Sequence, residues 1–268
     1  MIRDLETIII QNIREIPEAP LSLLLSGGID SSLVLALLRK AYPQMPIATF
    51  TLAKSKDYPD IVFAREIADL FETEHNEIIL SDEEYSRFSE EYDKVKQYNF
   101  KGDINAYILC STAKSFSNII VTGDGGDECF GGYWLHKYPL GYKETGAVKS
   151  FEDIHPVPRK HLKEMVDMGF RNFFFKETAE KEDYDAVWEY FIRVLAPRHF
   201  APLLHTAKVL NVKVYTPLFS ESLLSFIRSL PYMERVDRKI EKNLAFRYLP
   251  TTVVERESIG FDVALEIE

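Results

Sequence analysis

Short apolar runs alternate with longer amphipathic segments through the first half of the chain. Four runs are mostly apolar, as strands buried on both faces of a sheet are: residues 21–25, 47–52, 77–80 and 118–122. Five segments around them are typical of helices: residues 1–18, 33–38, 59–71, 82–98 and 105–117. This order predicts an α/β fold with a parallel, doubly wound sheet and right-handed crossovers.

The pattern changes beyond about residue 140. Strand signals become rare, prolines become frequent, and aromatic-rich helical stretches occur at 170–175 and 188–195. We therefore predict two parts, an α/β core over residues 1–140 and a mostly helical part over residues 141–268.

Charge and composition exclude several classes of protein. The 268 residues include 32 basic and 42 acidic side chains, which give a net charge of -10. Broad nucleic-acid binding needs a basic surface, so we expect no nucleic-acid partner. No window approaches the roughly 18 consecutive apolar residues of a membrane span, and the N-terminus lacks the order of a signal peptide. Cys110 and Cys129 have neither disulfide-framework nor metal-ligand spacing. We expect a cytoplasmic protein with no membrane contact.

A glycine-rich loop follows the first predicted strand. Residues 26–32 read Ser-Gly-Gly-Ile-Asp-Ser-Ser and lead into a helix. Glycines let the backbone approach an anion, and a helix N-terminus presents N–H groups and a positive dipole to it. Asp30 would repel a phosphate there unless a divalent cation lies between them. The loop predicts a phosphate site; a capped strand-to-helix turn is the alternative. It lacks the lysine and the spacing of a Walker loop.

A second glycine-rich loop, residues 123–133, follows the fourth predicted strand. It reads GDGGDECFGGY and holds three carboxylates. Ligands of open parallel sheets bind beyond the carboxyl ends of the strands, so both loops can face one crevice. A flexible acidic turn is the alternative for this loop.

Together the two loops resemble the synthetase domain of the asparagine synthetase family. The first matches the SGG-x-DS pattern of the N-type ATP pyrophosphatases, the PP-loop superfamily, which GMP synthetase, NAD synthetase and tRNA-modifying adenylases share. The second resembles the family's GEGxDExFGGY and separates it from those relatives. The resemblance is strong over 15–135 and weaker over 195–262, around Lys242 and from Arg256 to Phe261.

The resemblance implies ATP and Mg²⁺ as cofactors. A carboxylate would attack the α-phosphate of ATP, pyrophosphate would leave, and ammonia would displace AMP from the acyl-adenylate to give an amide. Asp30 and Asp127 would hold Mg²⁺ on the pyrophosphate side. Residues 1–140 would bind ATP, and residues 141–268 would complete the substrate site. The residues implied around the nucleotide are Leu24, Ser26, Gly27, Gly28, Asp30, Ser31, Ser32, Leu52, Thr122 and Gly123.

Two catalytic residues are implied in the same way. Asp124 stands where the family has a glutamate that helps to deprotonate ammonia, although aspartate is one methylene shorter. Lys242 would stabilise charge on the acyl-phosphate oxygens. A solvated helix lysine is the alternative for Lys242.

Departures from the family pattern leave the acceptor substrate open. Residues 213–220 stand where the family has an acidic residue and an arginine before Pro-Phe-Leu-Asp, and Glu257 or Ser258 replaces a lysine expected after Arg256. Aspartate as the carboxylate substrate is therefore one option among small carboxylic acids. Residue 2 is Ile2, not the cysteine of a glutaminase domain, so we expect ammonia from solution or from a separate glutaminase subunit. Homo-oligomerisation stays open.

Three other functions compete with this interpretation. An intramolecular amide former resembling the β-lactam synthetases would need a tyrosine–acid pair, for which Tyr107 and Tyr133 are candidates. A non-catalytic ATP-binding or regulatory module would keep the loops without an acceptor site. A tRNA-modifying adenylase is disfavoured by the acidic charge balance and by the second loop.

Overall fold

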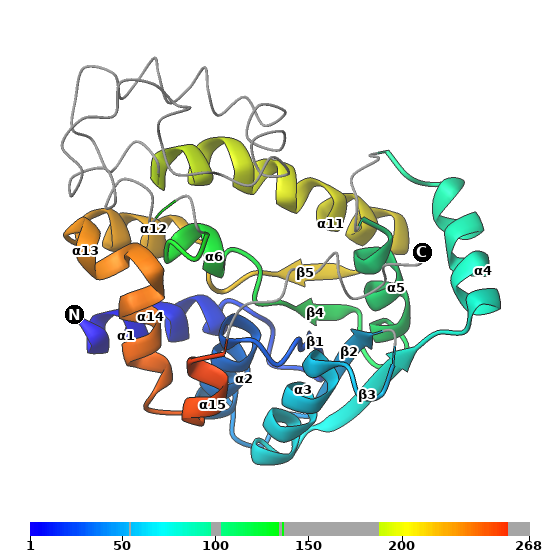
Figure 1. The fold of residues 1–268 in the computed structure, drawn as a ribbon, viewed down its shortest axis with the longest axis horizontal. Helices are drawn as coiled ribbons and strands as arrows, with labels where there is room; N and C mark the ends of the chain where they lie inside the picture. The colour runs from blue at the N-terminus through cyan, green and yellow to red at the C-terminus, as the bar shows by residue number, and fades with distance from the viewer. Residues whose placement is uncertain (54, 98–102, 134–135, 137–187, 257–268) are drawn as a thin grey trace.

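The sheet is parallel and has the predicted class. The computed structural model describes residues 1–53, 55–97, 103–133, 136 and 188–256. Within them five strands form one sheet in the order β3-β2-β1-β4-β5 (Figure 1). They are β1 (Leu21–Leu24), β2 (Ile47–Ala53), β3 (Glu74–Ile79), β4 (Ile119–Val121) and β5 (Lys213–Tyr215). The four predicted strands are confirmed, with ends that differ by up to three residues.

Helices occupy most of the chain between and after these strands. In the first half they are α1 (Ile2–Arg14), α2 (Ile29–Ala41), α3 (Pro59–Leu70), α4 (Asp82–Asp93), α5 (Asp103–Ala113) and the short α6 (Gly126–Cys129). After Trp188 they are α11 (Ala196–Leu210), α12 (Glu221–Arg228), α13 (Tyr232–Arg235), α14 (Lys239–Ala245) and α15 (Thr251–Val254). Among all the residues that the structure describes, no helix is long and apolar enough to cross a membrane.

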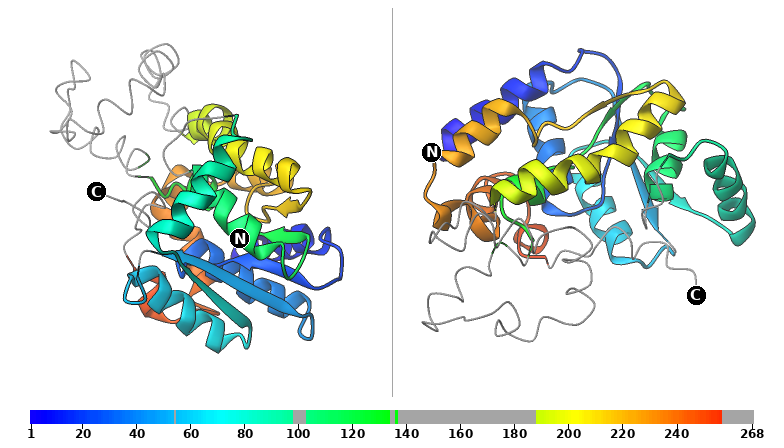
Figure 2. Two further views of the ribbon diagram at one scale, coloured as in Figure 1. Left: turned by 90° about the vertical axis from the view of Figure 1, so that its right-hand side faces the viewer. Right: turned by 90° about the horizontal axis from the view of Figure 1, so that it is seen from above.

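Side chains of the strands pack into two apolar clusters, one on each face of the sheet. Leu21, Leu23 and Leu25 lie in a cluster with side chains of α1, α2, α3, α12 and α14. Phe50 and Leu52 lie in the other cluster, with side chains of α5 and α11. Helices therefore cover both faces, and α1 packs beside α12 (Figures 1 and 2). This two-sided cover is the predicted doubly wound arrangement.

One strand was missed by the sequence analysis. β5 pairs in parallel with β4, with Ile119 opposite Lys213 and Val121 opposite Tyr215. Asn211 takes a left-handed conformation (φ 53°), which ends α11 and turns the chain into this edge strand. A three-residue strand is too short for an alternating pattern, so the sequence did not mark it within the part predicted to be mostly helical. The predicted boundary at residue 140 and the aromatic stretch at 170–175 lie outside the described residues, and the two-part division stays a prediction.

The strand order places the two glycine-rich loops at one edge. From β1 the sheet extends through β2 and β3 on one side and through β4 and β5 on the other. The order therefore reverses between β1 and β4, which hydrogen-bond in parallel. The loops that leave the carboxyl ends of these two strands meet at this switch point, where open α/β sheets bind their ligands.

Candidate active site

The first loop, residues 26–32, turns tightly against helix α3. Gly27 has a φ of +69°, and a Cβ there would lie 2.5 Å from the backbone N of Ala64 and 2.7 Å from Phe63 Cβ. An alanine at this position would meet both a strained backbone conformation and a helix backbone. The glycine thus lets α3 support the loop from behind.

Hydrogen bonds inside the loop fix its shape. The hydroxyl oxygens of Ser26 and Ser31 lie 3.1 Å apart, and the Ser26 N–H donates to Ser31 Oγ at 3.2 Å. The Gly28 N–H donates to Ser26 Oγ at 3.3 Å, and Gly28 is the N-cap of α2. Ser26 is exposed, whereas Ser32 is fully buried. The loop is therefore preorganised at a helix N-terminus, although contact with phosphate stays a prediction for each of these residues.

A nearly buried ion pair fastens the same loop from the C-terminal side. The Arg256 guanidinium donates to Asp60 Oδ1 and, at 3.4 Å, to the Ser26 carbonyl oxygen. It also lies 4.6 Å from the centroid of the Phe63 ring. The side chains of Arg256 and Asp60 are 9% and 10% exposed. Burial raises the pKa of the Asp60 carboxyl, and the hydrogen bond from Arg256 opposes that shift.

The second loop touches the first. A Cβ on Gly126 would lie 1.8 Å from Asp30 Oδ1, and a Cβ on Gly123 would lie 2.5 Å from the Ser31 N. Gly125 has a φ of +95° and starts the short helix α6. The glycines of the second loop thus let the two loops approach each other.

Arg238 joins the two predicted metal ligands. Its Nη1 lies 2.7 Å from both carboxylate oxygens of Asp30, and its Nη2 donates to Asp127 Oδ1. Nη1 also lies 3.2 Å from Glu241 Oε2, and the Arg238 side chain is only 8% exposed. The structure thus brings Asp30 and Asp127 together. Sequence reasoning missed Arg238 because a charged run before a helix is typical of a solvated face.

The backbone around Arg238 explains how it reaches the loops. Asp237 and Arg238 both have left-handed conformations, with φ of 57° and 58°. Their N–H groups donate to the carbonyl oxygens of Gly131 (3.0 Å) and Phe130 (2.9 Å), at the end of the second loop. Two consecutive non-glycine residues in this region are costly, so these hydrogen bonds and the side-chain ion pairs hold the turn.

One guanidinium serves three carboxylates here, and the charges compete. Burial alone would lower the pKa of Arg238, but Asp30, Glu241 and Asp127 raise it well above its ordinary value. Burial raises the pKa of Asp127 to about 7. The charges of Asp30 and Glu128 add to this shift, whereas Arg238 opposes it. Burial and the charge of Asp30 raise the pKa of Glu241 well above its usual range.

Asp30 and Asp127 have the donor chemistry of a magnesium site. Mg²⁺ is commonly bound by one or two carboxylates together with substrate phosphates and water. No cluster of three or more His, Cys, Asp or Glu side chains in the described part of the chain forms an all-protein metal cage. The pair therefore fits a cation that nucleotide phosphates help to hold, provided that the guanidinium between the carboxylates moves.

Asp124 lies near Glu128, another carboxylate of the second loop. The Thr122 hydroxyl donates to Asp124 Oδ2, and the Asp124 N–H donates back to Thr122 Oγ1 at 2.8 Å. The Asp124 residue is exposed to solvent. The protein atoms around its carboxyl nevertheless raise its pKa by desolvation, and the charges of Glu128 and Asp30 add to this effect. A raised pKa brings a carboxylate closer to the range of a general base.

The neighbouring group is Glu128 with its two partners. Glu128 Oε1 accepts a hydrogen bond from the Tyr133 hydroxyl at 2.8 Å and lies 2.7 Å from His199 Nδ1. Burial alone would lower the pKa of His199, but the contact with Glu128 raises it. Burial and the charge of Glu128 raise the pKa of Tyr133 well above its ordinary value. His199 comes from α11, far along the chain, and no local motif marks it.

The remaining predicted residues lie near the loops or in the core. Lys242 is on α14, one turn after Arg238, with its Nζ 3.7 Å from Asp237 Oδ1 and its side chain one-third exposed. Leu24 and Leu52 stand at or near the ends of β1 and β2 in the apolar cluster shared with α5. Their roles toward ATP stay predictions.

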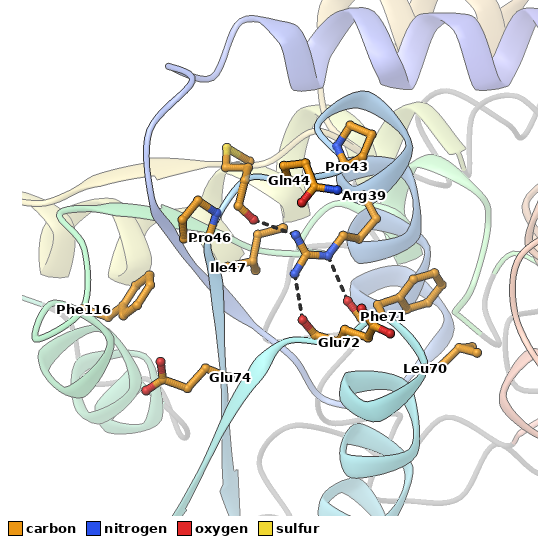
Figure 3. A pocket seen from close by; sticks show the side chains of 11 residues that line it. Arg39, Pro43, Gln44, Pro46, Ile47, Leu70, Phe71, Glu72, Glu74 and Phe116 are labelled. Carbon is orange, nitrogen blue, oxygen red and sulfur yellow. Dashed lines mark hydrogen bonds between the residues drawn. The ribbon is translucent and has the colours of Figure 1, made fainter.

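A cavity of about 600 Å³ lies away from these loops. Its lining includes Ile47 and Glu74, which begin β2 and β3, so it opens at the amino ends of the strands (Figure 3). Arg39 in this cavity donates to the carbonyl oxygens of Phe71, Met45 and Glu72 (Figure 3). The arginine ties these turns together, and the switch point at the opposite edge remains the candidate site.

The sequence of the chain is similar to those of known proteins. A family model described as asparagine synthase matches residues 13–267. A putative glutamine-hydrolyzing asparagine synthetase of Methanocaldococcus jannaschii is 29% identical over 127 residues, which are 46% of this chain and 24% of that protein. The glutamine-hydrolyzing asparagine synthetase of Homo sapiens is 34% identical over 127 residues, 43% of this chain and 22% of that protein. The chain thus spans about a quarter of the length of these relatives.

Solved structures resemble the chain at low identity. The NH3-dependent NAD synthetase from Campylobacter jejuni has 14% identity and a TM-score of 0.35, covering 93% of this chain and 95% of that one. The NMN synthetase from Francisella tularensis has 16% identity and a TM-score of 0.36, covering 95% and 88%.

Proposed function

The chain belongs to the asparagine synthase family, and on that premise we propose that it is an ATP-dependent ligase that converts a carboxylate into an amide. The observation that carries the proposal is the convergence of Asp30 and Asp127 from two glycine-rich loops at the sheet's switch point. The first loop resembles that of several other ATP pyrophosphatases, whereas the second resembles the loop of this family. Their convergence around buried charge supports the cleavage of ATP between its α- and β-phosphates.

In the proposed reaction, the first loop and the N-terminus of α2 orient the phosphates of ATP. A carboxylate oxygen of the substrate attacks the α-phosphorus, and the bond to the bridging oxygen breaks as pyrophosphate leaves. Asp30 and Asp127 would hold Mg²⁺, which neutralises charge on the leaving group when it is bound. The nitrogen of ammonia then attacks the acyl carbon, AMP leaves, and Asp124 accepts a proton from the nitrogen. Lys242 stabilises the charge on the acyl-phosphate oxygens.

The Tyr133–Glu128 pair bears on the intramolecular alternative. An intramolecular amide former needs a base to remove a proton from its own amine. Tyr133 donates to Glu128 at 2.8 Å, so Tyr133 and Glu128 form a tyrosine–acid pair of the kind that this alternative needs. The identity of the product separates ring closure from attack by external ammonia. Asp30 and Asp127 favour an active enzyme over a regulatory module.

The experiment measures products from Mg²⁺-ATP with aspartate and ammonium, and then with a panel of other small carboxylic acids. We expect AMP, pyrophosphate and one new amide. Asp30→Asn and Asp127→Asn should lose AMP formation, whereas Asp69→Asn, on the exposed face of α3, should keep it. ATP binding without AMP from any acid would favour the regulatory module. Amide formation by the purified chain from glutamine without ammonium would show that ammonia does not have to come from solution or a separate subunit.

A further inference from the structure

We propose that Arg238 is a positioning residue that occupies the cation position between Asp30 and Asp127, so that a divalent cation enters only together with a nucleotide that draws the guanidinium away. The inference rests on the proposed function, because it concerns the metal site assigned there. It adds a residue of this chain that controls when that site takes its metal.

The first step is that the guanidinium and a cation need the same oxygen atoms. Arg238 Nη1 lies 2.7 Å from each oxygen of Asp30, and Nη2 donates to Asp127 Oδ1. A cation held by both carboxylates would replace these hydrogen bonds. The two arrangements are therefore mutually exclusive.

The second step is that Arg238 is built into the site and is not a passing surface contact. Its side chain is 8% exposed, and the backbone N–H groups of Asp237 and Arg238 anchor the turn to the second loop. A Cβ on Gly132 would lie 2.7 Å from Arg238 Nε and 1.9 Å from Asp127 Oδ1, so the loop leaves room for this pair. Asp237 and Arg238 keep left-handed conformations, which place the Arg238 side chain between the loops.

The third step concerns what each ligand offers the displaced guanidinium. A cation alone would take Asp30 and Asp127 from Arg238 and leave its buried positive charge with Glu241 as the remaining carboxylate partner described above, beside a second positive charge, which is unfavourable. Phosphate oxygens are strong, geometrically matched acceptors for guanidinium. A nucleotide that arrives with the cation therefore supplies new partners, and the two ligands bind cooperatively.

The test measures Mn²⁺ binding by electron paramagnetic resonance without nucleotide. We expect Arg238→Gln to bind Mn²⁺ about tenfold or more tightly than the wild-type protein. Arg238→Lys, which keeps one charge but not the fork, should show a smaller gain. Lys239→Gln is the matched control, because Lys239 is exposed and pairs with Glu234. It removes one positive charge from the same turn and should behave as wild type.

Three outcomes decide the inference. Equal Mn²⁺ affinity of folded Arg238→Gln and wild type would overturn it, and so would an equal gain in Lys239→Gln. The wild-type protein supplies a measurement that does not depend on a variant folding. Millimolar Mg²⁺ alone should leave its Tm unchanged, whereas Mg²⁺ with a non-hydrolysable ATP analogue should raise Tm by more than the analogue alone. A saturable rise with Mg²⁺ alone would overturn the inference.

The failures of the two proposals are distinguishable. If wild type forms AMP and pyrophosphate but Arg238→Gln gains no metal affinity, only the role of Arg238 fails. If no carboxylic acid yields AMP, the proposed function fails, and the Mn²⁺ measurement still decides whether Arg238 competes with a cation.

Discussion

Replacing Gly27 by alanine should destabilise the fold far more than the same change at the adjacent Gly28. Gly27 has a φ of +69°, a conformation that costs an alanine about 1–2 kcal/mol. Its Cβ would also lie 2.5 Å from the backbone N of Ala64 and 2.7 Å from Phe63 Cβ. These are atoms of helix α3 that no side-chain rotation moves. Overpacking of this kind costs about 1–3 kcal/mol, so the free energy of unfolding should fall by about 2–5 kcal/mol.

Gly28 is the matched control because it tests the same substitution one residue away. Its φ is -80°, and the nearest atom to an added Cβ is Ser26 Oγ at 3.3 Å, which can rotate. Loss of the glycine N-cap should cost about 1 kcal/mol or less. Calorimetric unfolding should show a Tm lower by roughly 5–15 °C for Gly27→Ala and by a few degrees for Gly28→Ala. Equal losses would refute the packing of the first loop against α3.

Three further predictions follow. Burial lowers the pKa of His136 from 6.5 to about 3, so the unfolded chain takes up a proton before the folded chain as pH falls. The free energy of unfolding should therefore drop by about 2 kcal/mol between pH 7 and 5. Urea unfolding of His136→Phe should show a smaller drop, and an equal drop would contradict this assignment. Lys242→Ala should lower AMP formation without lowering Tm, since its side chain is one-third exposed, and unchanged turnover would support the solvated-helix alternative. Asp60→Ala should lower the free energy of unfolding by about 3–5 kcal/mol, because it removes the carboxylate partner of Arg256. In a double-mutant cycle, adding Arg256→Met should recover part of this loss. Strict additivity of the two substitutions would show that the pair is not coupled.

The two predicted metal ligands show how much of the site the local sequence indicates. Asp30 and Asp127 each sit in a glycine-rich loop directly after an apolar run, so the sequence predicts both the loops and their shared edge. Their meeting requires only a parallel sheet whose strands β1 and β4 are neighbours, which the structure confirms. Their role as metal ligands is implied by the resemblance to the asparagine synthetase family and stays a prediction.

Residues that act through distant contacts could not be found in this way. Arg238 and His199 are ordinary charged or polar residues at or within helices, and each gains its role from a partner at least 71 residues away. Arg256 follows α15 and was marked only by the weaker resemblance, which did not reveal its partner Asp60. β5 belongs to the same class, because three residues carry no period and only the edge of β4 makes them a strand.

The sequence by itself determined the fold class, the two glycine-rich loops and the acidic residues that they present. These features depend on the local order of apolar, glycine and acidic residues, which the chain carries in short segments. Only the tertiary structure decided that a guanidinium from the start of α14 lies between Asp30 and Asp127. The physical reason is that Arg238 is held there by a left-handed turn hydrogen-bonded to the second loop and by carboxylates from two other elements, and none of these contacts is local in sequence.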